Sequence, residues 1–394
     1  MNAVLSGIRV LDFGRYIAGP FCGMLLADLG AEVIRVEKRS GSEDRFITPI
    51  TESGEGALFL QLNRNKLSLT LDPLRPEGRE IVRKLIATAD VIIANLPPQT
   101  LRSMGLDRET VTAIKSDVVL VTISAFGEGG PYSERVGFDG VAQAISGAAY
   151  MNGRPGDPMR SFVPWADYGT ASLAAFGTLA ALMERAKTGK GQQVEGALLH
   201  TALAFNGSVL LEQAVLAKNR APTGNRSQFA GPSDIYKTTD GALIVQIAGR
   251  PLFERWARLM GEDHWLTDRR FKDDISCGDN GGALSARMQT WCSARTTSEA
   301  MTSLDAARIP SAPIYTPAEA LNDPHIRSMG FFERIDYPGL PEPALVTTTP
   351  IKLSASPGRI VSRAPTLGEH TDEVLAGLGY GTAEIASLRE KGVI

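Results

Sequence analysis

The strongest constraint on the fold lies in the first 37 residues, which alternate strand, helix and strand. Residues 8–13 predict a short apolar strand, Gly19-Pro20 opens an apolar helix that Gly30 ends, and residues 31–37 predict a second strand. Proline at a helix start loses no hydrogen bond, and glycine is a common helix stop. Two strands joined by one helix within about thirty residues pair in parallel with a right-handed crossover.

Further β segments continue this alternation. Most of them are separated by helices with apolar periodicity, and they cover residues 67–71, 91–95, 117–124 and 193–197. We therefore predict an α/β protein built on an open, mostly parallel sheet. Ligands bind such sheets at the carboxyl ends of the strands.

The turn after the first strand argues against a nicotinamide dehydrogenase. Residues 13–20 contain Gly14 and Gly19 but lack the close glycines of the G-x-G-x-x-G fingerprint, which admit a dinucleotide pyrophosphate. The second strand ends in Glu37, and the basic pair Lys38-Arg39 follows at once. Such a pair suits a phosphorylated ligand, and a solvated surface pair explains it equally well.

A domain boundary is predicted within residues 221–233, which are rich in Pro, Gly, Asn and Ser. A hairpin through Asp240-Gly241 and helices over 251–260 and 284–291 then predict a compact domain at 225–325. The segment 326–394 contains a predicted strand near 351–354 and a helix after Gly368 that Thr371 caps. The expected division is therefore 1–224, 225–325 and 326–394.

Composition narrows the class of protein and its partners. The chain has 394 residues and a net charge of −3, and its Lys and Arg are not massed in runs, so we expect no nucleic-acid or membrane partner. Gly, Pro and charges interrupt every apolar run, and the N-terminus lacks a signal-peptide layout. Three cysteines without C-x-x-C spacing predict reduced thiols in a cytoplasmic protein. The four histidines have no paired spacing, so no metal site is expected.

A lone carboxylate, Asp167, stands between the apolar run 162–165 and a long apolar helix that Gly189 ends. Aspartate is a favoured helix N-cap. It can also be a nucleophile or base held at a helix start, and these residues alone leave both interpretations open. Leu173, Phe176, Ala180 and Met183 fall near one face of the helix, which we predict to be its buried face.

Motifs spread along nearly the whole chain resemble those of the class III CoA-transferase family, of the formyl-CoA transferase type. Each motif is weak alone, but their order and spacing are specific. They lie at 7–13, 19–20, 29–37, 62–66, 137–139, 162–170, 188–192, 224–226, 309–313 and 367–370.

The resemblance implies a Rossmann-like large domain, built from the N-terminal half and the C-terminal tail, with a smaller α+β domain between them. It implies an interlocked homodimer in which each chain passes through the ring of the other. Asp167 matches the family's nucleophilic aspartate, which would form a mixed anhydride and then an aspartyl-CoA thioester. The substrates would be an acyl-CoA and a small carboxylic acid, with no permanently bound cofactor.

The resemblance also assigns residues to substrate. Carried over by position, CoA would contact Ile17, Ala18, Lys38, Leu71, Asp72, Asn95, Leu96, Pro97, Met104, Gly137, Phe138 and Asp139. Leu74 replaces a basic residue of the family, so the adjacent Arg75 is expected to compensate, and Arg102 is a further candidate phosphate contact. Ile17 replaces a polar amide of the formyl-CoA enzymes, which argues against formyl or oxalyl specificity. Arg15, Trp165 and Tyr168 are expected to line the acyl pocket, where Arg15 would suit a dicarboxylic acid.

Two alternatives to transfer remain open from the sequence. An α-methylacyl-CoA racemase or epimerase needs two acid–base groups, and the related racemases have His in a Gly-His-Asp motif where this chain has Gly137-Phe138-Asp139. A non-catalytic acyl-CoA-binding protein would tolerate Asp167→Asn, whereas a transferase would not. Transfer within one diacid, between its two carboxyl groups, is an intramolecular version of the same reaction.

Overall fold

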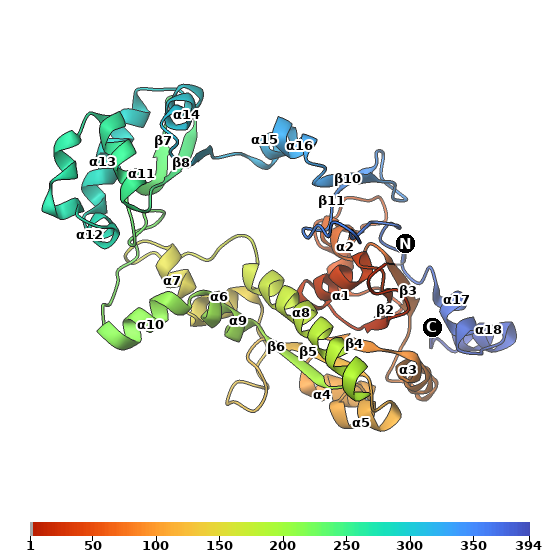
Figure 1. Cartoon of the computed structure of the whole chain (residues 1–394). Helices are drawn as coiled ribbons and strands as arrows, with labels where there is room; N and C mark the ends of the chain where they lie inside the picture. Colours follow the sequence, from red (N-terminus) through yellow and green to blue (C-terminus); the bar gives the residue numbers. More distant parts are fainter. Residues whose placement is uncertain (1–2) are drawn as a thin grey trace. The chain divides into compact units, whose positions relative to one another are not determined.

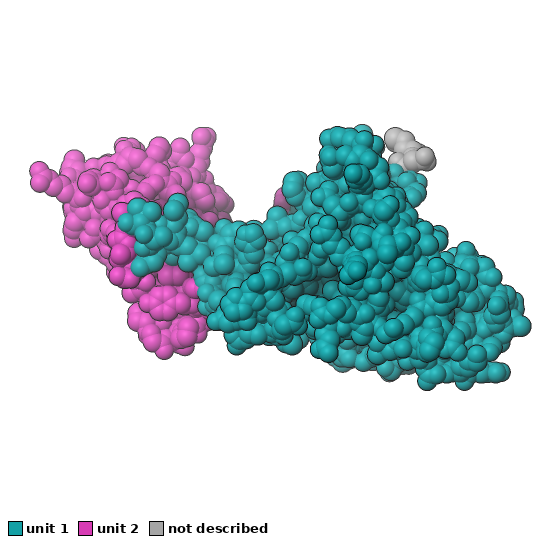
Figure 2. Space-filling view, turned by 90° about the horizontal axis from the view of Figure 1, so that it is seen from below, with its two compact units in different colours: residues 1–146, 161–215, 328–394 teal, residues 147–160, 216–327 magenta. Residues whose placement is uncertain are grey.

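The computed structural model describes residues 3–394 and divides the chain into two compact units. Unit 1 comprises residues 1–146, 161–215 and 328–394, and unit 2 comprises residues 147–160 and 216–327 (Figure 2). Each unit has a hydrophobic core of its own.

Unit 1 is built on a six-stranded sheet in which every strand pair is parallel, as the sequence predicts. The strands run in the order β3-β2-β1-β4-β5-β6. In the central register Leu11 lies opposite Ile34 on one side and Ile92 on the other. The strands are β1 (Arg9–Asp12), β2 (Glu32–Glu37), β3 (Lys66–Thr70), β4 (Val91–Ala94), β5 (Val119–Ser124) and β6 (Gln193–Ala197).

Helices cover both faces of this sheet (Figure 1). Successive strand residues point to opposite faces, so Val10 and Val33 pack with α1 (Ala18–Asp28), α8 (Trp165–Thr188) and α9 (Leu198–Phe205). Leu11 and Ile34 pack instead on the opposite face, with α3 (Pro76–Thr88), α4 (Pro98–Met104), α5 (Arg108–Ile114), α17 (Thr371–Gly377) and α18 (Thr382–Glu390). The C-terminal helices therefore complete the core of unit 1.

The buried face of α8 is the reverse of the predicted one. Its buried side chains are small, namely Ala166, Thr170, Ala171, Ala174, Ala175, Thr178 and Ala181. Leu173, Phe176 and Met183, which periodicity assigned to the core, are 48%, 71% and 66% exposed. A helix packed closely against a sheet and a neighbouring helix needs small residues at the contact, and the large residues are left on its outer face.

The remaining elements of unit 1 are short. They are η1 (Glu43–Phe46), α2 (Ala57–Leu62), α6 (Asp139–Ile145), α10 (Gly207–Leu216) and the antiparallel pair β10 (Phe332–Ile335) and β11 (Ala344–Thr347). The strand predicted near 351–354 is wrong, because these residues form no ladder and follow the β10–β11 pair in irregular structure. The predicted Thr371 cap is also wrong, because His370 occupies the N-cap position of α17 and makes no side-chain capping bond.

Unit 2 is a small α+β body. Its antiparallel sheet has the order β7 (Ser233–Lys237), β8 (Ala242–Gln246), β9 (Ser311–Pro313), and the β7–β8 hairpin turns at Asp240-Gly241 as predicted. Trp256 and Phe253 centre its core. Its helices are α7 (Ala148–Asn152), α11 (Arg250–Met260), η2 (Asp263–Leu266), η3 (Arg269–Phe271), α12 (Asp274–Asp279), α13 (Gly281–Ser293), α14 (Thr297–Ala306), α15 (Pro317–Asn322) and α16 (Pro324–Ser328).

Across residues 3–394, none of the helices combines the length and the apolar character that crossing a bilayer requires.

Candidate active site

A cavity of about 200 Å³ lies in unit 1 at the carboxyl ends of β1, β4 and β5. The strand order reverses between β1 and β4, and this switch point is where open α/β sheets bind their ligands. Asp167, from the first turn of α8, lines the cavity together with residues from the β1–α1 turn, the segment after β4 and the loop before α6.

The β1–α1 turn is held tightly against the sheet. A Cβ on Gly14 would come within 2.8 Å of the Gly19 Cα, so both ends of the turn require glycine. Asn95, just after β4, clamps the turn from the side, because its amide accepts the Arg15 N–H at 2.7 Å and donates to the Arg15 carbonyl at 2.8 Å. Tyr16 follows with φ +60°, an uncommon conformation for a residue with a side chain. The turn is therefore built as a rigid wall of the cavity.

A buried ion pair fixes the same turn from below. Asp12, the last residue of β1, accepts the Gly14 N–H at 2.7 Å and meets the Lys66 ammonium at 2.7 Å. Lys66 also donates to the Pro20 carbonyl and to the Asn63 side chain. Burial is the largest single influence and would raise the pKa of Asp12, but the charges of Lys66 and Arg35 and the hydrogen bonds from Lys66 and Gly14 together lower it. Asp12 is therefore a carboxylate that holds the turn in place.

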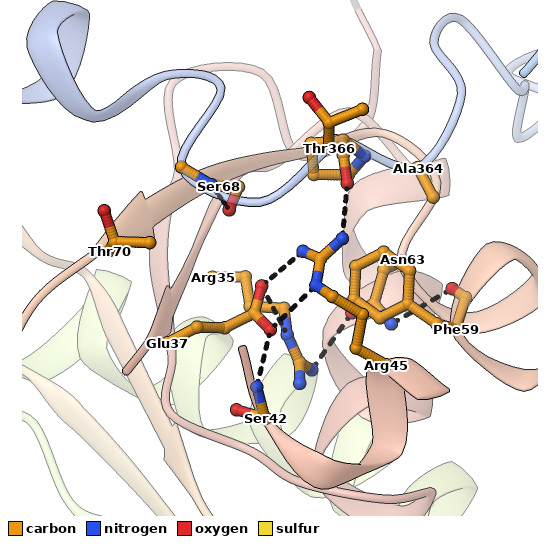
Figure 3. A network of polar contacts seen from close by, with 12 residues as sticks. Arg35, Glu37, Ser42, Arg45, Phe59, Asn63, Ser68, Thr70, Ala364 and Thr366 are labelled. Carbon is orange, nitrogen blue, oxygen red and sulfur yellow. Dashed lines mark hydrogen bonds and ion pairs between the residues drawn. The ribbon is translucent and has the colours of Figure 1, made fainter. Parts of the chain in front are cut away.

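A second buried network supports the end of β2 (Figure 3). Glu37 accepts two hydrogen bonds from the Arg45 guanidinium at 3.2 and 2.6 Å, and Arg45 lies over the Phe59 ring. Arg45 also donates to the Pro365 carbonyl, which ties the C-terminal segment to η1. Arg35 pairs with Asp44 through both carboxylate oxygens. Glu37 is thus a structural group, enclosed by cations.

One carboxylate partly neutralises Lys38, which follows β2, and Arg15, which follows β1. Lys38 lies 2.5 Å from Glu43, and the other Glu43 oxygen lies 3.7 Å from the Arg15 guanidinium. All three side chains are close to half exposed. They place a mixed charge cluster beside the β1–α1 turn.

Asp167 does not cap its own helix. The N-cap position of α8 is Pro164, and the N–H groups of Ala166 and Asp167 donate instead to Asp139 Oδ1, at 2.8 and 3.3 Å. Asp139 is buried, and its other oxygen accepts from Gln143. Asp139 therefore acts as an N-cap supplied by another helix, which leaves the Asp167 side chain free to face the cavity.

The Asp167 carboxylate is partly buried and has no hydrogen-bond or ion-pair partner among residues 3–394. Its pKa is raised to about 7, first because burial disfavours the charge and second because Asp139 is negative. A buried carboxylate with a strongly raised pKa and no partner is typical of a functional site. A buried carboxylate with a structural role is usually paired with a cation or with hydrogen-bond donors. The raised pKa also differs from the ordinary value, near 4, that the residue type alone suggests.

The structure places eight of the sequence-assigned residues on this cavity. They are Arg15, Ala18, Asn95, Leu96, Pro97, Gly137, Phe138 and Asp167. Gly137 is required there, because a Cβ would come within 2.9 Å of the Ala125 side chain. The contacts of these residues with CoA or an acyl group stay predictions.

The other assigned residues lie outside the cavity lining. Leu71 and Met104 are in the core, Asp72 and Arg75 pair with each other, and Arg102 lines a different cavity of about 270 Å³. Trp165 stacks on Phe205, and Tyr168 packs edge-on against Phe21. Ile17 packs on the core, Lys38 pairs with Glu43 and Asp139 caps α8.

The loop before α6 supplies the lining residues that sequence reasoning missed. From this loop they are Ser133, Glu134, Arg135 and Val136, and the rest of the unassigned lining is Tyr16, Pro98, Ile123, Ser124, Ala125 and Leu198. The glycine-rich stretch at 127–130 marks this loop in the sequence, but nothing in its composition shows that it folds over the end of β5.

A metal centre is not formed by the part of the chain that the structure describes, since no three His, Cys, Asp or Glu side chains gather in a way that could hold an ion.

Comparison with known proteins gives the family. The CoA-transferase family III profile matches residues 5–371. The chain is 34% identical to a succinyl-CoA–D-citramalate CoA-transferase of Chloroflexus aurantiacus, over 99% of this chain and 98% of that protein. It is 32% identical to a formyl-CoA:oxalate CoA-transferase of Rhodopseudomonas palustris, over 100% of this chain and 98% of that protein.

Solved structures agree with these relatives. A CAIB/BAIF family protein from Brucella suis is 31% identical, with TM-score 0.83 over 96% of this chain and 100% of that one. Rv3272 from Mycobacterium tuberculosis is 27% identical, with TM-score 0.82 over 94% and 99%. The chain belongs to CoA-transferase family III, which confirms the resemblance seen in its motifs. It is an acyl-CoA:carboxylate CoA-transferase.

Proposed function

We propose that Asp167 carries the transfer covalently, as the nucleophile that holds first the acyl group and then CoA. The observation that supports this most is its placement: an unpartnered carboxylate on a cavity at the switch point of the sheet. The Asp139 side chain accepts hydrogen bonds from backbone N–H groups in the first turn of α8. The Asp167 carboxylate is therefore held in position without itself acting as the helix cap. Splitting one exchange into several easier steps is the advantage of covalent catalysis.

The proposed reaction steps need only the acyl-CoA, the acceptor acid and Asp167. The ionised Asp167 attacks the thioester carbonyl, forms a mixed anhydride and expels CoA thiolate. The thiolate then attacks the aspartyl carbonyl, giving an aspartyl-CoA thioester and releasing the donor acid. The acceptor carboxylate then attacks the aspartyl-CoA thioester, which gives a second mixed anhydride and expels CoA thiolate. The thiolate attacks the acyl carbonyl of the acceptor, which gives the new acyl-CoA and restores Asp167 as a carboxylate.

The backbone donors for the oxyanions of these steps do not come from the first turn of α8. The N–H groups of Ala166 and Asp167 are taken by Asp139, and that of Tyr168 by the Pro164 carbonyl. The phenyl ring of Phe138 lines the cavity where a racemase of this type would carry His. Racemisation requires a second acid–base group, so Phe138 in place of that His favours transfer.

The test is a trap of the covalent intermediate. The protein is incubated with an acyl-CoA and then with hydroxylamine, which converts an aspartyl-CoA thioester into a hydroxamate and free CoA. Peptide mass spectrometry is expected to find the hydroxamate at Asp167 in the native protein and nowhere in Asp167→Asn. CoA exchange that persists in Asp167→Asn, or a hydroxamate at another residue, would show that the proposal is wrong.

We further infer that the working form is the interlocked homodimer that the resemblance implies. The outer face of α8 presents Leu173, Phe176 and Met183 to solvent, and α10 adds Leu211 and Val215, which are 65% and 70% exposed. Monomeric proteins rarely leave so many large apolar side chains uncovered. A second copy of this chain would cover them.

A further inference from the structure

We propose that Arg135 binds the remote carboxylate of the substrate acids, which makes this chain a transferase for dicarboxylic acids. This inference rests on the proposed function, because it concerns the acids that exchange at Asp167. It differs from the expectation drawn from the sequence, which gave that role to Arg15.

Arg135 lines the same cavity as Asp167 and carries an uncompensated charge. No carboxylate among residues 3–394 lies within ion-pair distance of its guanidinium, which rests 4.6 Å from the centre of the Tyr132 ring. The aromatic face orients the side chain but leaves its donors available. An arginine held in this way is suited to bidentate recognition of a carboxylate.

Arg15 is the weaker candidate, although it lines the same cavity. Its guanidinium lies 3.7 Å from the Glu43 carboxylate, so part of its charge is already neutralised by this ion pair. Its peptide group is clamped by Asn95, so its backbone is a fixed part of the wall. The structure therefore leaves Arg135 as the better free cation for an incoming anion.

Arg135 also stands apart from the nucleophile. Neither arginine forms an ion pair with Asp167, and neither is among the causes that set the pKa of that carboxyl. A cation in contact with Asp167 would lower its pKa and weaken it as a nucleophile, whereas a cation elsewhere on the cavity leaves it unaffected. Because both side chains line one cavity, a diacid bound there would have one carboxyl group reacting at Asp167 and the other bound by Arg135.

One recognition group would serve both substrates. In the proposed cycle the donor acid leaves the cavity before the acceptor acid enters it, so both meet the same lining. An acid that ends in a methyl group leaves the arginine without its partner, and polar sites reject such analogues strongly. Donor and acceptor are therefore both expected to be diacids.

The experiment compares acyl-CoA donors that differ only in a terminal carboxylate or methyl group: succinyl with butyryl, glutaryl with valeryl, and malonyl with propionyl. Exchange of labelled acid into its own CoA thioester gives kcat/KM for each donor. We expect the native protein to prefer the diacid of at least one pair. Arg135→Gln should lower kcat/KM for that diacid roughly 10- to 100-fold, the range for one hydrogen-bonded charge pair, with the methyl analogue nearly unchanged.

Two further variants complete the test. Arg135→Lys keeps the charge and should retain part of the preference. Arg83→Gln removes an exposed arginine that pairs with Glu80 on α3 and should leave the diacid preference as it is in the native protein.

Three outcomes overturn the proposal. An equal loss for both members of a pair in Arg135→Gln would mean a structural role, and loss of preference in Arg15→Gln alone would return the role to Arg15. A native protein that exchanges methyl-terminated acids as well as diacids would remove the need for a recognition group. Failure of the proposed function looks different, because then no donor exchanges through Asp167 and no hydroxamate forms there.

Discussion

The raised pKa of Asp167 predicts a pH dependence that most carboxylate nucleophiles do not show. Only the ionised form attacks, and the pKa is about 7. Below that value kcat/KM for the acyl-CoA should fall about tenfold per pH unit, and above it the profile should level off. At pH 5.5, about 1.5 units below the midpoint, the rate should be roughly 30-fold below the plateau.

The variant Asp139→Asn separates the two causes of the raised pKa of Asp167. Burial is the larger cause and the Asp139 charge the second. The amide oxygen of Asn can still accept the N–H groups of Ala166 and Asp167, so the helix start is kept while the charge is removed. The midpoint should move down by less than half of the rise, that is by under about 1.5 pH units. Phosphate groups of the substrate titrate near 6, but they are common to both proteins and cancel in the comparison.

The same shift makes a prediction about stability. The pKa of Asp167 is raised on folding, so its ionisation opposes folding, and stability is lost as pH rises from about 4 through about 7. Three units at about 1.4 kcal/mol each give an upper limit of about 4 kcal/mol at pH 8, reduced because the carboxylate is only partly buried. Asp167→Asn should therefore exceed the native protein in urea stability at pH 8, and the difference should narrow as the pH is lowered towards about 4.

Two results would refute this reasoning. A native kcat/KM that is flat between pH 5.5 and 8.5 would mean that Asp167 is ionised throughout, with an ordinary pKa. An Asp167→Asn protein no more stable than the native one at pH 8 would mean that ionised Asp167 does not lower the free energy of unfolding.

Two other perturbations test the support of the site and the proposed assembly. Lys66→Met leaves Asp12 buried without its cation and should lower the free energy of unfolding by about 3–5 kcal/mol in urea titration. Adding Asp12→Asn should restore part of that loss, and a single variant as stable as the native protein would contradict the role given to the pair. Phe176→Glu places a charge on the exposed apolar face of α8 and should shift the protein to monomer in sedimentation velocity, while Lys187→Glu at the end of the same helix should not. An unchanged dimer, or a monomeric native protein, would contradict the proposed assembly.

The sequence predicted the parallel sheet and singled out the carboxylate on which the proposed function rests. Alternating β segments and helices require parallel strands with crossovers, because a helix between two strands returns the chain to the same end of the sheet. Asp167 stood out as a lone acidic residue between two apolar runs, where a helix cap and a functional carboxylate were both open interpretations. The family motifs then gave it a role, and the family itself is confirmed by the relatives.

Tertiary structure alone decided how that carboxylate is held and what faces it. Periodicity cannot distinguish a helix face that packs on a sheet from one that stays uncovered, so α8 was assigned the wrong buried side. Asp139 caps a helix 26 residues further along the chain, counted from Asp139 to Trp165, and no local pattern reveals a cap supplied from elsewhere. Arg135 came to the cavity because its loop folds over the end of β5. The pKa of Asp167 depends on burial and on a neighbouring charge, and both are properties of the folded chain, not of the residue.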